Sequence, residues 1–336
     1  MSRKERSHRF TTATTTRDRI GILASYSSVV PRADRQPLTS ALQMRLPRRP
    51  DGSIIDQLFI QRDGFHMHYS SFLTLQPAAW LNDEVINYAT KKLIQPLNQR
   101  TQCYNSHFFS RCLIQTAEGP RFEYNDVKRW SDRIPGGLDS LEDLYVPINK
   151  DNSRWIFKRV NFPTKTINLY DSLRLDHSNS VYLMTMKHYL YAEYQRLHPG
   201  QNVGFQQWAQ QWTSIDHSDD CPRQGNGDEC GVFMILSMAL LAQGIRLSAS
   251  TYSQATVDDR QIRRRIAHIA WLDRLEPESE AATITQWLGQ RTTGAPAPPQ
   301  LPHPQSTRSG PKQAAAKKAL MKKLKHTSNR ERLRRR

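Results

Sequence analysis

A polar, glycine-rich loop that leads directly into a long apolar run is the feature that most constrains how this chain can fold. The loop covers residues 224–231 and carries one cysteine, Cys230, and the apolar run follows over residues 232–241. The run is long enough for a buried helix and lacks the β-branched bias of a strand. Because Asp228 and Glu229 are favourable N-cap or first-turn residues, we expect this helix to begin at or near Cys230.

The position of Cys230 favours a chemical function. At a helix N-terminus, the helix dipole and the free N–H groups favour a thiolate, which is the nucleophilic form of cysteine. The simpler interpretation is a small buried cysteine at a helix cap. However, the flanking Gly225, Asn226 and Gly227 expose the backbone beside the sulfur, which a structural cysteine does not need. We therefore predict that Cys230 is a nucleophile.

Positive charge is concentrated at the two ends of the chain. The 336 residues carry a formal charge of +17, of which residues 1–50 supply +8 and residues 301–336 supply +11, so that residues 51–300 are nearly neutral at −2. We predict a disordered Arg/Ser/Thr-rich leader over residues 1–50, a globular domain over residues 51–290, and a Pro-rich linker with a basic tail over residues 291–336. The leader also resembles an organelle transit peptide, although it lacks a clear amphipathic helix.

Several classes of protein are disfavoured by composition. No apolar stretch is long enough to span a bilayer and the N-terminus has no hydrophobic signal core, so we expect no membrane contact. The four cysteines are too few and too scattered for a disulfide framework, and neither a Cys-x-x-Cys pair nor a histidine cluster is present. We therefore predict a reducing compartment, no metal site and no cofactor. The cysteines are Cys103, Cys112, Cys221 and Cys230.

Apolar periodicity predicts helices on both sides of a group of short strands. A first helix is expected to begin at Asn82 or Asp83, with apolar positions at helical spacing over residues 85–93. In the last predicted helix, residues 263–265 are arginines that we expect to face water largely. The predicted strands cover residues 144–149, 155–162 and 166–171, and the later helices cover residues 181–197 and 258–275.

Five of these stretches, taken in order, resemble motifs of the ubiquitin-like-protein protease family, the SUMO (sentrin-specific) proteases. Each motif alone is weakly specific, whereas five in the right order and spacing are strongly specific. A small departure is Glu229, where the family usually has aspartate. The motifs are Trp80-Leu81-Asn82-Asp83; Val146-Pro147-Ile148-Asn149 with Trp155; Leu169-Tyr170-Asp171-Ser172-Leu173; Gln224, Asn226 and Cys230-Gly231-Val232-Phe233; and Tyr252-Ser253-Gln254 with Arg263-Arg264-Arg265-Ile266.

The resemblance implies an α+β, papain-like cysteine protease fold with a central mixed β-sheet and flanking helices. It makes Cys230 the nucleophile, Asp171 the orienting carboxylate and Gln224 the oxyanion-hole donor. A donor of this kind contributes about 3 kcal/mol to stabilising the tetrahedral oxyanion. Core packing would account for either tryptophan alone, and a strand-end turn for Asp171. The substrate-binding residues implied by the resemblance are Trp80 and Trp155, which would flank a tunnel for a Gly-Gly tail, and Asp83.

Arg154 is the main departure from the family pattern. The family's histidine directly precedes the tryptophan that matches Trp155, but here that position holds Arg154. A histidine takes the thiol proton and returns it to the leaving amine, whereas arginine stays protonated and can do neither. Arg154 could still pair with Asp171 and lower the pKa of Cys230. His177 and His217 are alternative proton carriers, but both are more simply interpreted as loop histidines.

Three functions are consistent with these patterns. The first is a cysteine isopeptidase, a hydrolase that matures or removes SUMO or another ubiquitin-like modifier. The second is a pseudoprotease that binds the modifier without cleaving it. The third is a basic protein that contacts nucleic acid through its tail, where Lys317-Lys318, Lys322-Lys323 and Arg334-Arg335-Arg336 form clusters typical of nuclear localisation signals or phosphate-binding arms. A solvated tail without a partner is the alternative. We expect a monomer in the nucleus, or in the nucleus and cytoplasm.

Overall fold

The computed structural model describes residues 30–275 except positions 31, 63, 175–178 and 260. The predicted basic tail and most of the predicted leader lie outside the described residues, as does His177. Within the described part, no helix combines the length and the apolarity that crossing a bilayer requires. The described residues also contain no group of three or more His, Cys, Asp or Glu side chains that could hold a metal ion.

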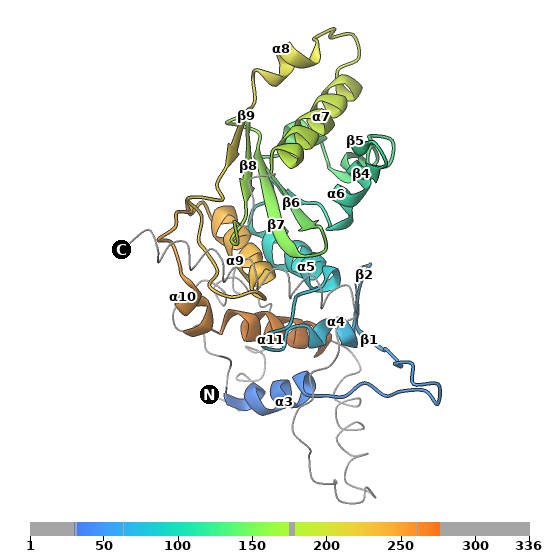
Figure 1. Cartoon of the computed structure of the whole chain (residues 1–336), viewed down its shortest axis with the longest axis vertical. Helices are drawn as coiled ribbons and strands as arrows, with labels where there is room; N and C mark the ends of the chain where they lie inside the picture. Colours follow the sequence, from blue (N-terminus) through green and yellow to red (C-terminus); the bar gives the residue numbers. More distant parts are fainter. Residues whose placement is uncertain (1–29, 31, 63, 175–178, 260, 276–336) are drawn as a thin grey trace, which may run out of the picture.

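A mixed five-stranded sheet forms the centre of the fold (Figure 1). Its strand order is β3-β6-β7-β8-β9, with an antiparallel β6-β7-β8 core and a parallel strand added at each edge. All three strands predicted from the sequence are confirmed as β6, β7 and β8. The strands are β3 (Thr101–Cys103), β6 (Asp143–Lys150), β7 (Arg154–Asn161), β8 (Thr166–Tyr170) and β9 (Thr213–Asp216).

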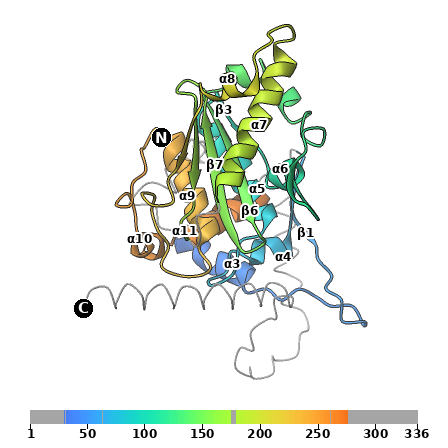
Figure 2. The ribbon, with the colours of Figure 1, turned by 45° about the horizontal axis from the view of Figure 1, so that its top comes forward.

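Helices cover both faces of this sheet (Figures 1 and 2). Because strand side chains alternate between faces, Trp155 and Phe157 of β7 join the core shared with α9 and α5, whereas Ile156 and Val160 join the core shared with α7 and α6. The predicted α+β fold with a mixed sheet and flanking helices is therefore confirmed. The four helices are α5 (Asp83–Ala89), α6 (His107–Cys112), α7 (Ser180–Leu197) and α9 (Cys230–Ala242).

The remaining elements surround this centre. The α-helices are α3 (Arg32–Leu42), α4 (Tyr69–Leu73), α8 (Phe205–Ala209), α10 (Gln254–Asp259) and α11 (Ile262–Leu275). The remaining strands are β1 (Leu58–Arg62), β2 (Phe65–His68), β4 (Leu113–Thr116) and β5 (Gly119–Phe122). A π-helical turn, η1 (Thr90–Ile94), continues α5, and 3-10 turns occur at η2 (Gln95–Leu97), η3 (Ser131–Arg133) and η4 (Leu138–Ser140).

Two sequence predictions need correction. Residues 32–42, which we assigned to a disordered leader, form α3, whose Leu38 is fully buried in the core that α11 also joins. Arg263 and Arg265 of α11 are buried rather than water-facing, and Arg264 is half-buried. Arg264 donates to the Thr39 hydroxyl and to the Arg35 carbonyl of α3. The arginines of α11 therefore lie in contacts between segments, which an apolar pattern cannot reveal.

Candidate active site

Cys230 is the first residue of α9, as the sequence predicts, and its side chain is buried. In the loop just before the helix, the Asn226 side chain accepts from the backbone N–H groups of Asp228 and Glu229, at 3.4 and 3.2 Å, and Glu229 is the N-cap residue. The backbone N–H of Trp155 donates to the Cys230 sulfur at 3.4 Å. The sulfur thus lies where the N-terminus of α9 meets the start of β7.

Burial decides the protonation state of Cys230. Removing the sulfur from water raises the pKa of the Cys230 thiol to about 11, although the N–H groups of Trp155 and Gly231 act in the opposite direction. At neutral pH the unliganded site therefore holds a thiol. The sequence prediction of a thiolate is not met in this state, because the cost of desolvating the anion exceeds the gain from the helix terminus.

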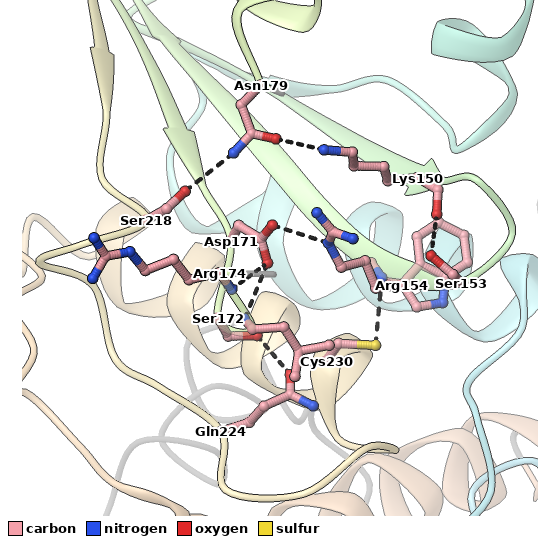
Figure 3. A network of polar contacts seen from close by, with 12 residues as sticks. Lys150, Ser153, Arg154, Asp171, Ser172, Arg174, Asn179, Ser218, Gln224 and Cys230 are labelled. Carbon is pink, nitrogen blue, oxygen red and sulfur yellow. Dashed lines mark hydrogen bonds and ion pairs between the residues drawn. The ribbon is translucent and has the colours of Figure 1, made fainter. Parts of the chain in front are cut away.

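Arg154 and Asp171 form a buried ion pair beside the cysteine (Figure 3). The Arg154 Nε donates to Asp171 Oδ2 at 3.0 Å, and the exposed fractions of the two side chains are 3% and 0%. The second carboxylate oxygen accepts from the backbone N–H groups of Leu173 and Arg174, at 3.0 and 3.2 Å. Asp171 is therefore held on both oxygens, and its orientation is set by Arg154 where the family pattern has a histidine.

The β6–β7 hairpin explains why Arg154 reaches this carboxylate. Asp151 and Asn152 adopt left-handed backbone angles in the turn, with φ of 54° and 49°, a conformation that Asn and Asp tolerate better than most residues. Arg154 therefore begins β7 opposite Lys150. Since successive side chains alternate, the Trp155 indole joins the α9 core. The Arg154 guanidinium is turned to Asp171 (Figure 3).

Gln224 is fixed by two polar contacts. Its side-chain oxygen accepts from the Ser172 hydroxyl at 2.7 Å, and its amide nitrogen donates to the Asn226 carbonyl at 2.9 Å. An amide nitrogen carries two N–H bonds, so one is used by Asn226 and a second is available in principle for an oxyanion. In the view of Figure 3, the amide lies below the Cys230 side chain and the Arg154–Asp171 pair lies above it.

The two predicted tunnel residues are linked to the same site through their indole N–H groups. Trp80 donates to the Gly227 carbonyl at 2.8 Å, in the loop before Cys230. Trp155 donates to the Leu81 carbonyl at 2.7 Å, next to Trp80. The structure thus brings both tryptophans to the nucleophile, with Trp155 buried and Trp80 half-buried.

Asp83 lies at the outer side of this region. It is the first residue of α5, and its carboxylate lies 3.4 Å from the ring of His107. The side chain is 44% exposed, so it remains accessible to a partner.

His217 is not placed to replace the missing histidine. Its ring lies 3.0 Å from Asn168 and 3.0 Å from Asp220 and stacks on Tyr170. Among the described residues, no histidine makes a hydrogen bond to Cys230 or Asp171. The interpretation of His217 as a structural loop histidine agrees with these contacts.

Sequence reasoning named Ser172 and Arg263 only as members of family motifs and missed their roles in shaping the site. Ser172 orients the Gln224 amide, and Arg263 donates to the Glu229 carboxylate at 2.9 Å, next to the nucleophile. A possible signal for the second was the acidic pair Asp228-Glu229, since a buried carboxylate needs a cation or several donors. Nothing in the local sequence indicates that the cation comes from α11.

Comparison with known proteins agrees with this geometry. The sequence model described as Ulp1 protease family, C-terminal catalytic domain, matches residues 79–268, more than half of the chain. The chain belongs to the Ulp1 protease family. The matched segment contains every candidate site residue named above, from Trp80 to Cys230, together with Arg263.

Individual relatives of the Ulp1 family are distant. Ubiquitin-like-specific protease 1 of Saccharomyces cerevisiae is 26% identical over 227 residues, which is 65% of this chain and 31% of that protein. Putative ubiquitin-like-specific protease 1B of Arabidopsis thaliana is 27% identical over 180 residues, 52% of this chain and 50% of that protein. This chain therefore spans about a third to a half of these relatives.

A solved Ulp1 structure shares the fold. The C-terminal Ulp1 protease domain, solved in complex with Smt3, the yeast ortholog of SUMO, has a TM-score of 0.58 and 24% sequence identity to this chain. The match covers 75% of this chain and 100% of that domain. At this identity the likeness extends to the architecture, and the chemistry of the site must be argued from its own residues.

Proposed function

We propose that this chain binds the C-terminal tail of SUMO or another ubiquitin-like modifier at Cys230, and that it is a cysteine isopeptidase of strongly reduced activity. The observation that carries the proposal is the contact between the Cys230 sulfur and the backbone of Trp155, with Trp80 tied to the loop that precedes the cysteine. Names of the family's curated members, which include ubiquitin-like-specific and sentrin-specific proteases, support the class of substrate.

Binding of the tail would use the two indoles. Glycine lacks a side chain, so a Gly-Gly segment can pass between closely spaced aromatic rings where other residues are excluded. The tail carbonyl would then lie near the Cys230 sulfur, with the backbone N–H of Cys230 and the free N–H of Gln224 as donors to a developing oxyanion. These groups account for recognition and for charge stabilisation.

Proton transfer is the step that this site supports poorly. Attack by Cys230 requires loss of the thiol proton, and release of the amine requires that a proton be returned. Arginine cannot exchange a proton at physiological pH, and the guanidinium of Arg154 is already bound to Asp171. Acid–base catalysis contributes about 10²–10⁴-fold, so hydrolysis should be slower by a factor of this order.

The test separates reactivity from turnover. SUMO with a C-terminal vinyl sulfone can label a reactive cysteine without any leaving amine, whereas a SUMO isopeptide conjugate must be hydrolysed. We expect labelling of Cys230 and slow or undetectable cleavage of the conjugate. Rapid cleavage would show that Arg154 is compatible with full activity, and absence of labelling would refute a reactive Cys230 at a modifier-binding site.

A basic tail function is the second candidate. Residues 301–336 carry a net charge of +11, and such segments release counterions from nucleic acid or act as nuclear localisation signals. We propose that the tail directs the protein to the nucleus, separately from the Cys230 site. Deleting residues 305–336 should shift a tagged protein out of the nucleus or reduce salt-sensitive nucleic-acid binding, while labelling by SUMO vinyl sulfone stays unchanged.

A further inference from the structure

Arg263 lies at the start of α11 and contacts two segments that are far from it in sequence. Its Nε donates to the Glu229 carboxylate at 2.9 Å, and its Nη2 donates to the Asp228 carbonyl at 3.0 Å. Its Nη1 donates to the carbonyls of Thr74 and Gln76, at 2.8 and 3.2 Å. One buried guanidinium therefore joins the loop before the nucleophile to the turn after α4.

The turn after α4 leads into the segment that carries Trp80 and Leu81. This segment is itself tied to the nucleophile loop, because Trp80 donates to Gly227, and to β7, because Trp155 donates to Leu81. The first turn of α9 also packs tightly on Leu81, since a Cβ added at Gly231 would lie 3.0 Å from the Leu81 side chain. Together with the bond from the Trp155 N–H to the Cys230 sulfur, these contacts join the nucleophile loop, the Trp80 segment and β7, and Arg263 adds a second link between the first two.

The charges of this pair suit a positioning role. Burial raises the pKa of Glu229, and the neighbouring Arg263 opposes that shift. Glu229 is the N-cap residue of α9, so a charge-assisted bond at its side chain fixes the backbone that delivers Cys230. The planar guanidinium offers donors in three directions, which a lysine ammonium cannot reproduce at the same acceptors.

We infer that Arg263 is a positioning residue that holds the Trp80 segment and the nucleophile loop against each other. The inference rests on the proposed function in so far as these two segments form the tail-binding site. When a substitution weakens the hydrogen bonds of Arg263, the Trp80 segment and the nucleophile loop separate locally. Cys230 then becomes accessible to small reagents, and the modifier tail is bound less well.

The experiment compares Arg263→Lys with Arg264→Lys in the full chain. Arg264 is the matched control, because it is the next residue of the same helix and contacts α3 instead of the nucleophile loop. Iodoacetamide alkylation of all four cysteines is followed by mass spectrometry. All four are buried, so Cys103 and Cys112 report on opening of the whole fold while Cys230 reports on the site.

For Arg263→Lys we expect alkylation of Cys230 to rise at least tenfold while Cys103 and Cys112 stay protected, and labelling by SUMO vinyl sulfone to fall at least tenfold. Arg264→Lys should change neither rate by more than about twofold. Glu229→Gln, which removes the charge from the other member of the pair, should reproduce the selective effect.

If Arg263→Lys and Glu229→Gln expose all cysteines together, or if neither variant exposes Cys230, the inference is overturned. Failure of the wild type to react with SUMO vinyl sulfone would refute the proposed function, and the alkylation pattern would still decide the role of Arg263.

Discussion

On one side of Cys230, the α9 terminus and the indoles of Trp80 and Trp155 form the part of the site that we propose receives a narrow peptide tail. On the other side, Arg154 and Asp171 form an ion pair that fills the place of a proton carrier. The first side depends on shape and on N–H donors, which an arginine nearby does not disturb. Proton transfer on the second side depends on a group that titrates near neutral pH, and arginine does not titrate there. A single residue can therefore separate recognition from chemistry within one site.

The largest expected effect comes from removing the sulfur. Cys230→Ser should abolish labelling by SUMO vinyl sulfone and any isopeptide cleavage, because a serine hydroxyl without a base is a far weaker nucleophile. The change removes little volume, so the melting temperature should stay within a few degrees of wild type. Equal turnover by the purified mutant and wild type would exclude Cys230 as the nucleophile.

A second prediction uses pH to test how the two sides interact. With the Cys230 pKa raised to about 11, the thiolate fraction should grow about tenfold per pH unit, or about 10³-fold between pH 7 and pH 10. The rate of iodoacetamide alkylation at Cys230 should rise accordingly in the folded chain. The denatured chain is the control, and its alkylation rate should be half-maximal near pH 8.5, the pKa of an unperturbed cysteine, and level off above that pH. A plateau near neutral pH in the folded chain would mean that Arg154 or the helix terminus does stabilise the thiolate.

Restoring a titratable group should recover chemistry on the deficient side. We expect Arg154→His to raise isopeptide cleavage by at least about 10²-fold, the lower end of what a positioned acid–base group contributes. The imidazole would lie between Cys230 and Asp171, which is already oriented by the N–H groups of Leu173 and Arg174. The measurement is the initial rate of SUMO-conjugate hydrolysis.

Arg154→Lys is the matched control for that variant. It keeps a positive charge beside Asp171 but adds no group that exchanges protons near neutral pH, so we expect no gain. An equal gain in both variants would attribute the effect to removal of the guanidinium and not to proton transfer by the imidazole. No gain from histidine in a variant that melts like wild type would support the binding-only function.

The sequence predicted the elements of this site better than its electrostatics. Local residue types predict the strands at residues 144–149 and 155–162, the start of α9 at Cys230 and the cap at Asn82, and the structure confirms all of them. The raised pKa of Cys230 depends on how completely distant segments cover the sulfur. Local propensity carries no information on that burial.

Long-range contacts explain the remaining misses. Arg263 binds acceptors on Glu229 and on the turn at residues 74–76, and α3 is held in part by Arg264. Each of these contacts joins segments separated by tens to hundreds of residues in the chain. A run of three arginines on a helix therefore looks solvent-exposed in sequence even where the fold uses the charges internally.

The smallest expected effect tests whether the recognition side is intact. Trp80→Ala should weaken binding of a SUMO tail by about 30-fold, because truncating a tryptophan at the centre of an interface costs about 2 kcal/mol or more.

Trp155 is buried, and its truncation would also destabilise the core by about 3–5 kcal/mol, so Trp155→Phe is the better variant. It keeps one aromatic ring against the α9 core but loses the N–H bond to the Leu81 carbonyl and part of the indole volume, and we expect a loss of affinity of about tenfold or less. Affinity is measured with Cys230→Ser in the background, so that no covalent step contributes, and a SUMO lacking its last two glycines is the control. If Trp80→Ala binds the intact and the truncated SUMO with the affinities of the parent protein, the tail does not pass beside Trp80, and recognition must be sought on another face of the domain.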